Sequence, residues 1–259
     1  MLALFSLTHQ VRSQALKVEY LVKINTNNAL SRSEIKYDLI IRDNESIYFN
    51  TAVGVSQFKY GDPNSDTKEI DGLIRVKLDD NTYAFVRKDA FYKGYEKNVL
   101  VYNDVLVRKK VIVKESLDQL FKWTIELGKD SLILNYKCQK AVASFRGRKY
   151  EAFFTSELGV IGGPWKFDGL PGVILAVRSI DNYFVIKPLQ CVLNFKSEKI
   201  QNPYKSEKLV YTWDQFVSEF EIKLKQILKL LKSKSESGES GSIKITDRIE
   251  DLGIKDMSF

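Results

Sequence analysis

Histidine is nearly absent from this chain, and its single copy, His9, lies in an N-terminal stretch that we expect to be removed. Imidazole is the usual general base near neutral pH, the central group of Ser-His-Asp and Cys-His sites, and the commonest protein ligand of transition metals. A mature chain without histidine therefore excludes most hydrolase mechanisms. Paired carboxylates, a Ser-Lys arrangement and an oxygen-ligated calcium site stay open.

Cysteine is scarce as well, with two residues, Cys138 and Cys191. In an oxidising compartment an even number of cysteines is typical of a disulfide. This one would close a loop of 53 residues, which the chain-entropy argument equates with roughly 4 kcal/mol of stability. The alternative is two small buried side chains on adjacent strands. Two thiols without imidazole do not make a metal site, so no metal or other cofactor is predicted.

Long apolar runs are also missing, and none approaches the ~20 residues that a transmembrane helix requires. Residues 1–15 are typical of the end of a secretory signal peptide, because an apolar stretch precedes Ser13-Gln14-Ala15, a small-x-small cleavage site. The alternative is a short disordered or membrane-touching end. We expect export, and hence a periplasmic or outer-membrane-associated protein without a transmembrane helix.

Apolar and aromatic residues are plentiful, at 44% and 12% of the chain, and they recur in short alternating runs. In residues 16–24, Val18, Tyr20 and Val22 alternate with charged side chains, the pattern of a half-buried strand. Asn and Asp pairs separate many of the runs, which is typical of an antiparallel meander. Further strands are predicted at 33–42, 45–50, 73–78, 82–88, 98–103, 105–113, 121–127, 135–145, 149–155, 173–180, 183–187 and 190–195.

From Trp213 the apolar spacing changes to three and four residues, which predicts an amphipathic helix of about twenty residues. Thr212 and Gln215 occupy capping-box positions at its start. We expect this helix to pack across the concave or open face of the sheet; docking on a membrane or a partner is the alternative. The predicted fold is mainly β, a curved antiparallel sheet or open half-barrel with one long C-terminal helix packed against it. Residues 16–234 form the domain, and 235–259 form a Ser/Glu/Gly linker and a polar tail.

The formal net charge is +7, with lysine and arginine spread over the predicted strands. Such spreading is typical of solvated faces. No nucleic-acid-reading motif is present, so we predict no nucleic-acid partner. Anionic lipid head groups are a weaker expectation for a basic exported protein.

Turn residues are concentrated in 163–177, which reads G-P-W-K-F-D-G-L-P-G-V-I-L-A-V. Pro171 fixes φ near −65°, and Gly172 can adopt the positive φ of a type II turn. We interpret this segment as a rigid corner that leads Val173 and Ile174 into a strand. A phosphate cradle is the alternative, but it would need more glycines and a following helix.

The run G-L-P-G-V-I at 169–174 resembles the signature of the GLPGLI family of secreted Bacteroidetes envelope proteins, with Val173 where the signature has leucine. Segments 136–141, 147–155 and 163–167 follow the order found in that family, so the resemblance covers about residues 120–180. It implies a secreted β-rich protein without an established biochemical activity. The motif residues that it assigns to the structural corner are Gly163, Pro164, Trp165, Phe167, Gly169, Leu170, Pro171, Gly172, Val173 and Ile174.

Three functions follow from these observations. The first is a non-enzymatic envelope scaffold that binds a lipid or other apolar ligand, or an outer-membrane protein. The second is an accessory component of an outer-membrane assembly. The third is a carboxylate-dependent hydrolase that uses ionisable groups near the corner, Glu151, Glu157, Lys166 and Asp168; because no catalytic motif surrounds them, we assign no catalytic residue.

Overall fold

The computed structural model describes residues 15–25, 33–51, 73–79, 82–87, 90–107, 109–118, 120–196, 199–234, 242–243, 248–255 and 257–258. The expected signal peptide, apart from Ala15, lies outside the described residues. Among the described residues, no helix is long and apolar enough to cross a membrane.

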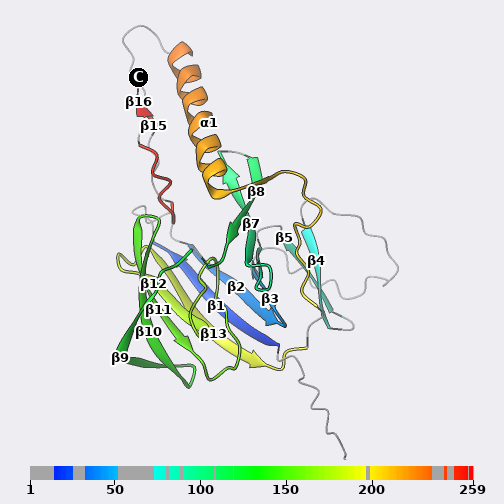
Figure 1. Cartoon of the computed structure of the whole chain (residues 1–259). Coiled ribbons are helices and arrows are strands. Elements are labelled where there is room, and N and C mark those ends of the chain that lie inside the picture. The colour runs from blue at the N-terminus through cyan, green and yellow to red at the C-terminus, as the bar shows by residue number, and fades with distance from the viewer. Residues whose placement is uncertain are drawn as a thin grey trace, which may run out of the picture.

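Twelve strands form one curved sheet that does not close into a barrel (Figure 1). The described strands pair antiparallel except for β14 and β8, which are parallel. The mainly β, open architecture predicted from the sequence is therefore confirmed. Across the sheet the order is β14 (Val210–Tyr211), β8 (Lys109–Ser116), β7 (Val99–Leu106), β6 (Phe91–Gly94), β3 (Glu45–Asn50), β2 (Ser33–Arg42), β1 (Leu16–Ile24), β13 (Phe184–Leu193), β12 (Val173–Ser179), β11 (Arg148–Thr155), β10 (Tyr136–Phe145) and β9 (Thr124–Ile133).

Strand β1 joins the two halves of the sheet, because it pairs with β2 on one side and with β13 on the other. Its side chains alternate as predicted, with Leu16, Val18, Tyr20 and Val22 buried. Two short pairs lie apart from the large sheet: β4 (Leu73–Asp79) with β5 (Thr82–Arg87), and β15 (Ser242–Ile243) with β16 (Met257–Ser258).

Several predicted boundaries are wrong. Strand β6 was not predicted, because four residues are too short to show a period. The predicted break at Asp104 does not exist, since β7 continues to Leu106. The turn follows at Val107, whose φ of 60° is left-handed. The two strands expected at 183–187 and 190–195 are one strand, β13, and Pro188 is accommodated opposite Tyr20 beside a bulge in the β1–β13 register.

Helix α1 (Trp213–Lys234) begins with the predicted capping box. The backbone N–H of Gln215 donates to Thr212 Oγ1, and the backbone N–H of Thr212 donates to Gln215 Oε1. Its buried residues Phe216, Phe220 and Leu224 pack against β7 and β8. The helix therefore stands at one end of the sheet (Figure 1) and packs against β7, β8 and β14. The prediction of one C-terminal helix packed against an open sheet is confirmed.

The polar tail expected at 235–259 is partly folded into the protein. Glu250 and Leu252 are buried, at 6% and 7% exposed, and Leu252 belongs to the apolar cluster beneath α1. The sequence of this segment is too polar to predict burial. The partners that bury Glu250 and Leu252 come from distant parts of the chain.

Candidate functional site

The segment 162–172, which we call the motif loop, packs inside the curved sheet. Trp165, Phe167 and Leu170 belong to the main apolar core, together with side chains of β1, β10, β11 and β12. Both ends of the loop are tied to the sheet, since the Ile174 N–H donates to the Gly162 carbonyl at 2.8 Å. The predicted corner thus also fills part of the interior of the curved sheet. The motif residues are buried except for Gly169 and Pro171.

The role predicted for Gly172 needs correction. Its φ is not positive; the positive values in this loop belong to Gly162, Trp165 and Gly169. Glycine is required at 172 for a different reason, because a Cβ there would lie 2.2 Å from the Thr155 carbonyl oxygen. The chain instead bends through a 2.8 Å hydrogen bond from the Gly172 N–H to the Leu170 carbonyl, across Pro171.

Lys93, on β6, holds the motif loop from within. Its ammonium is fully buried and donates to the Gly163 and Phe167 carbonyls, at 2.9 and 2.6 Å, and to Asp168 Oδ2 at 2.9 Å. Burial lowers the pKa of Lys93, although the Asp168 carboxylate opposes this effect. Two carbonyls and one carboxylate thus use all three donors of the ammonium.

Lys166 is the centre of a second buried charge cluster. Its Nζ lies 2.6 Å from Glu250 Oε2 and 2.7 Å from Tyr102 Oη. Glu115 lies 3.6 Å from the same nitrogen, and Arg146 forms ion pairs with both Glu115 and Glu250. Two cations thus face two carboxylates, and the cluster joins β8, the β10–β11 turn, the motif loop and the C-terminal segment.

Burial and the neighbouring charges move the pKa values of Glu115, Arg146 and Tyr102 in this cluster. Burial would raise the pKa of Glu115, but Lys166 and Arg146 outweigh it and lower that pKa. Burial would likewise lower the pKa of Arg146, and the two carboxylates raise it instead. Burial, with the charges of Glu250 and Glu115, raises the pKa of Tyr102 well above its usual value. Glu115 and Arg146 therefore stay ionised near neutral pH, and Tyr102 stays a neutral phenol.

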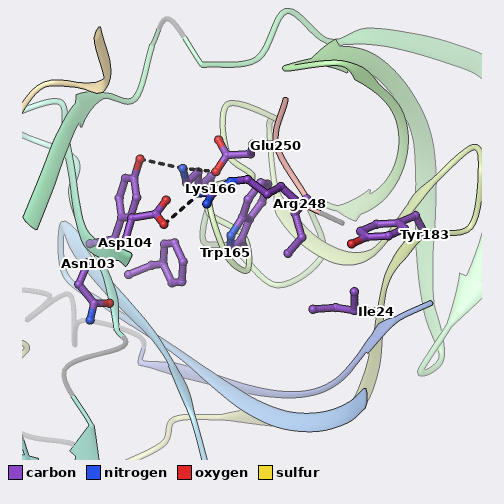
Figure 2. A pocket seen from close by; sticks show the side chains of 11 residues that line it. Ile24, Asn103, Asp104, Trp165, Lys166, Tyr183, Arg248 and Glu250 are labelled. Carbon is purple, nitrogen blue, oxygen red and sulfur yellow. Dashed lines mark hydrogen bonds and ion pairs between the residues drawn. The ribbon is translucent and has the colours of Figure 1, made fainter. Parts of the chain in front are cut away.

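A cavity of about 290 Å³ adjoins this cluster. Figure 2 shows Trp165 and Arg248 on one side of it, with Ile24 and Tyr183 across from them. Part of the cavity wall is aromatic or aliphatic, and part is charged. The charged part includes an ion pair in which Arg248 Nη2 lies 3.2 Å from Asp104 Oδ1. Its lining residues are Ile24, Phe91, Tyr102, Asn103, Asp104, Trp165, Lys166, Tyr183, Arg248, Ile249 and Glu250.

The ionisable groups proposed from the sequence for acid–base chemistry are not brought together. Glu151 is paired with Lys140 and Arg178, Asp168 with Lys93, and Lys166 with Glu250. Glu157 is exposed on the loop after β11. Of the four, only Lys166 lines the cavity.

The two cysteines are free in the structure. Cys138 lies on β10 and Cys191 on β13, with β11 and β12 between these strands in the sheet, so the strands are not adjacent. Burial raises the pKa of each thiol to about 11. Among the described residues, no group of three or more His, Cys, Asp or Glu side chains is placed to hold a metal ion.

Sequence reasoning missed five residues of this region, Lys93, Glu115, Arg146, Arg248 and Glu250. Each of the five is charged, and a charged side chain is usually solvated. One signal was present for Lys93, which lies between aromatic residues in Phe91-Tyr92-Lys93-Gly94-Tyr95.

Comparisons with known proteins identify no family. No family model and no curated protein matches the chain. Among solved structures, two of PNGF-II are similar: the one in space group P21 has a TM-score of 0.46 and 16% identity, covering 77% of this chain and 31% of PNGF-II. The one in space group C2 has a TM-score of 0.48 and 15% identity, covering 80% and 33%. The chain thus matches about a third of that protein's length.

Proposed function

We propose that this protein is a non-enzymatic, exported envelope protein that binds a small ligand in the cavity beside Trp165 and Lys166. The proposal rests on one observation, the aromatic lining of that cavity by Phe91, Tyr102, Trp165 and Tyr183. Export and an envelope location rest on the signal-like N-terminus and on the resemblance to GLPGLI proteins.

The size of the cavity limits the ligand. At about 290 Å³, it is at the lower end of small-molecule sites, which hold roughly 300–1,000 Å³. Among the described residues, the space next to the motif loop inside the curved sheet is filled by side chains, because Trp165 and Phe167 pack there against Phe145, Phe184 and Tyr150. The ligand that fits is therefore a short aromatic or aliphatic group that carries a polar end toward Arg248 and Asp104.

The test uses 1-anilinonaphthalene-8-sulfonate, whose aromatic body and single anionic group suit these walls. Its fluorescence is titrated against the full chain and two variants. Ile24→Trp fills the cavity and should weaken binding at least tenfold, whereas Ile222→Trp, on the exposed side of α1, should leave binding unchanged. Equal binding by both variants would contradict a ligand site here. Native mass spectrometry of protein extracted gently from cells would then show which small molecule accompanies it.

A second candidate, binding to an outer-membrane protein, is favoured by the β9–β10 hairpin. Leu127 and Leu132, both on β9, are 84% and 70% exposed, and Leu132 lies two residues before the turn residue Leu134. Exposed apolar side chains gathered on one hairpin are typical of protein contact surfaces. Crosslinking in cells should capture one dominant partner with the wild-type protein and lose it with Leu127→Glu/Leu132→Glu; unchanged capture would exclude this surface.

A further inference from the structure

The second half of helix α1 extends beyond the part of the helix that packs on the sheet (Figure 1). Phe216, Phe220 and Leu224 are buried against β7 and β8, whereas none of the described side chains between 225 and 233 is buried. Strands β15 and β16 also contact α1, yet they do not cover this half. About two and a half turns of the helix are therefore open to solvent.

Large apolar side chains are exposed on this part of α1. The exposed fractions are 46% for Ile222, 59% for Leu230 and 46% for Leu231. With about 3.6 residues per turn, Ile222 and Leu230 lie on the side of the helix that faces away from the buried stripe. Exposed apolar side chains gathered in this way are typical of a contact surface.

Lysines surround these apolar side chains. Residues 222–234 contain five lysines and no acidic residue, whereas the three acidic residues of α1 all lie between 214 and 221. The helical period places Lys225 and Lys229 on one side of the exposed apolar side chains and Lys223 on the other. The dipole of the helix favours lysines near its C-terminus, but it does not explain the exposed isoleucine and leucines among them.

Two of the lysines make weak contacts within the helix. Lys225 Nζ lies 2.7 Å from Glu221 Oε1, and Lys223 Nζ donates to Gln226 Oε1 at 3.3 Å. Both contacts are exposed to solvent, and exposed pairs contribute little free energy. The ammonium groups can therefore turn to phosphate oxygens outside the protein at small cost.

We propose that the second half of α1 binds the surface of an anionic lipid bilayer through Ile222, Leu230, Leu231 and the lysines around them. Exposed apolar side chains among lysines are typical of helices that lie at a membrane surface, where the ammonium groups reach the head groups and the apolar side chains enter the acyl boundary. A bilayer matches both features, whereas a nucleic acid would match only the charge. This inference is independent of the ligand proposed for the cavity.

The test measures co-sedimentation of the full chain with vesicles of equimolar phosphatidylglycerol and phosphatidylcholine, and with vesicles of phosphatidylcholine alone. We expect the wild-type protein to bind the anionic vesicles at least about tenfold more tightly, and added salt to weaken this binding. Lys223→Gln/Lys229→Gln/Lys232→Gln should bind them at least about tenfold more weakly, because each lysine near an anionic surface strengthens binding about fivefold.

Two further variants separate the local surface from the total charge. The matched control, Lys129→Gln/Lys137→Gln/Lys187→Gln, removes the same charge from exposed positions on β9, β10 and β13, and it should bind as the wild-type protein does. Leu230→Gln/Leu231→Gln keeps every lysine and should weaken binding at least about fivefold, because less apolar surface leaves water. All these positions are exposed, and melting curves establish that the variants fold.

Four results would overturn the proposal. The first is equal binding of the wild-type protein to both kinds of vesicle, and the second is an equal loss of binding in the two lysine variants. The third is unchanged binding by the leucine variant. The fourth is binding of a short DNA duplex as tightly as the anionic vesicles, which would show attraction to any polyanion.

Discussion

Lys93 Nζ and Asp168 Oδ2 lie 2.9 Å apart inside the sheet, and they join the short strand β6 to the motif loop across 75 residues of sequence. A buried ion pair of this kind adds little net stability by itself, because both charges lose their hydration. What it does is fix position: the same ammonium binds the Gly163 and Phe167 carbonyls, so the loop has one place to pack.

Removing only Lys93 should therefore be severe. Lys93→Met leaves the Asp168 carboxylate without its cation and is expected to lower the free energy of unfolding by about 3–5 kcal/mol. The double variant Lys93→Met/Asp168→Asn should regain a large part of this loss, because no buried charge is left unpaired. Urea unfolding of Lys93→Met, Asp168→Asn and the double variant measures the interaction free energy between the two side chains. Losses of stability that simply add would contradict this interaction.

Gly172→Ala should destabilise the protein through backbone collision. The new Cβ would lie 2.2 Å from the Thr155 carbonyl oxygen. The backbone cannot move away easily, because Thr155 on β11 is paired with Val173 on β12. We expect a loss of about 2–3 kcal/mol. Gly128→Ala is the control: its Cβ meets nothing within 4 Å, and only its φ of +72° is strained, which costs about 1 kcal/mol. Thermal unfolding that ranks Gly128→Ala as the more damaging change would refute the close-approach explanation.

Acid should weaken the Lys166 cluster through Glu115. Its pKa is lower in the folded protein than the usual 4.5, so the unfolded chain binds the proton more readily. The stability that this carboxylate provides is complete above about pH 4.5 and is lost as the pH falls toward the lowered folded value. Glu115→Gln should flatten the fall in urea midpoint between about pH 5 and 3, whereas the exposed variant Glu157→Gln should retain the wild-type slope.

The cysteines should behave as two protected thiols. With pKa values of about 11, each is almost wholly protonated at pH 8, so reaction with Ellman's reagent should be slow in the folded protein. In guanidinium chloride without reductant, two thiols per chain should react promptly. A count of zero would show that Cys138 and Cys191 form a disulfide after all.

Local sequence pattern predicted the sheet well where one face of a strand is buried. The bounds of β2 and β3 agree with those expected from alternation, and α1 begins at the expected capping box. The same reasoning missed β6, and it misplaced the β7–β8 turn. In these strands the limits are set by pairing with distant neighbours, which no local window contains.

The candidate site was largely beyond sequence reasoning. The motif loop was recognised from its glycines and prolines, but its place inside the sheet depends on Lys93, and the cavity depends on the meeting of Trp165 with Arg248. A lysine or glutamate in a polar stretch is indistinguishable from a solvated one until its partner is known. Glu250 is the clearest case, because Lys166 precedes it by 84 residues.

The irregular edge strand β9 has a consequence for how this protein behaves when crowded. Between its pairs with Cys138 and Lys140, β9 advances from Ser131 to Glu126, so five steps on one strand face two on the other. At the opposite edge, β14 is only two residues long. The edge at β9 therefore does not present one straight row of free amides and carbonyls on which a foreign strand could pair. The edge at β14 offers only two residues for such pairing.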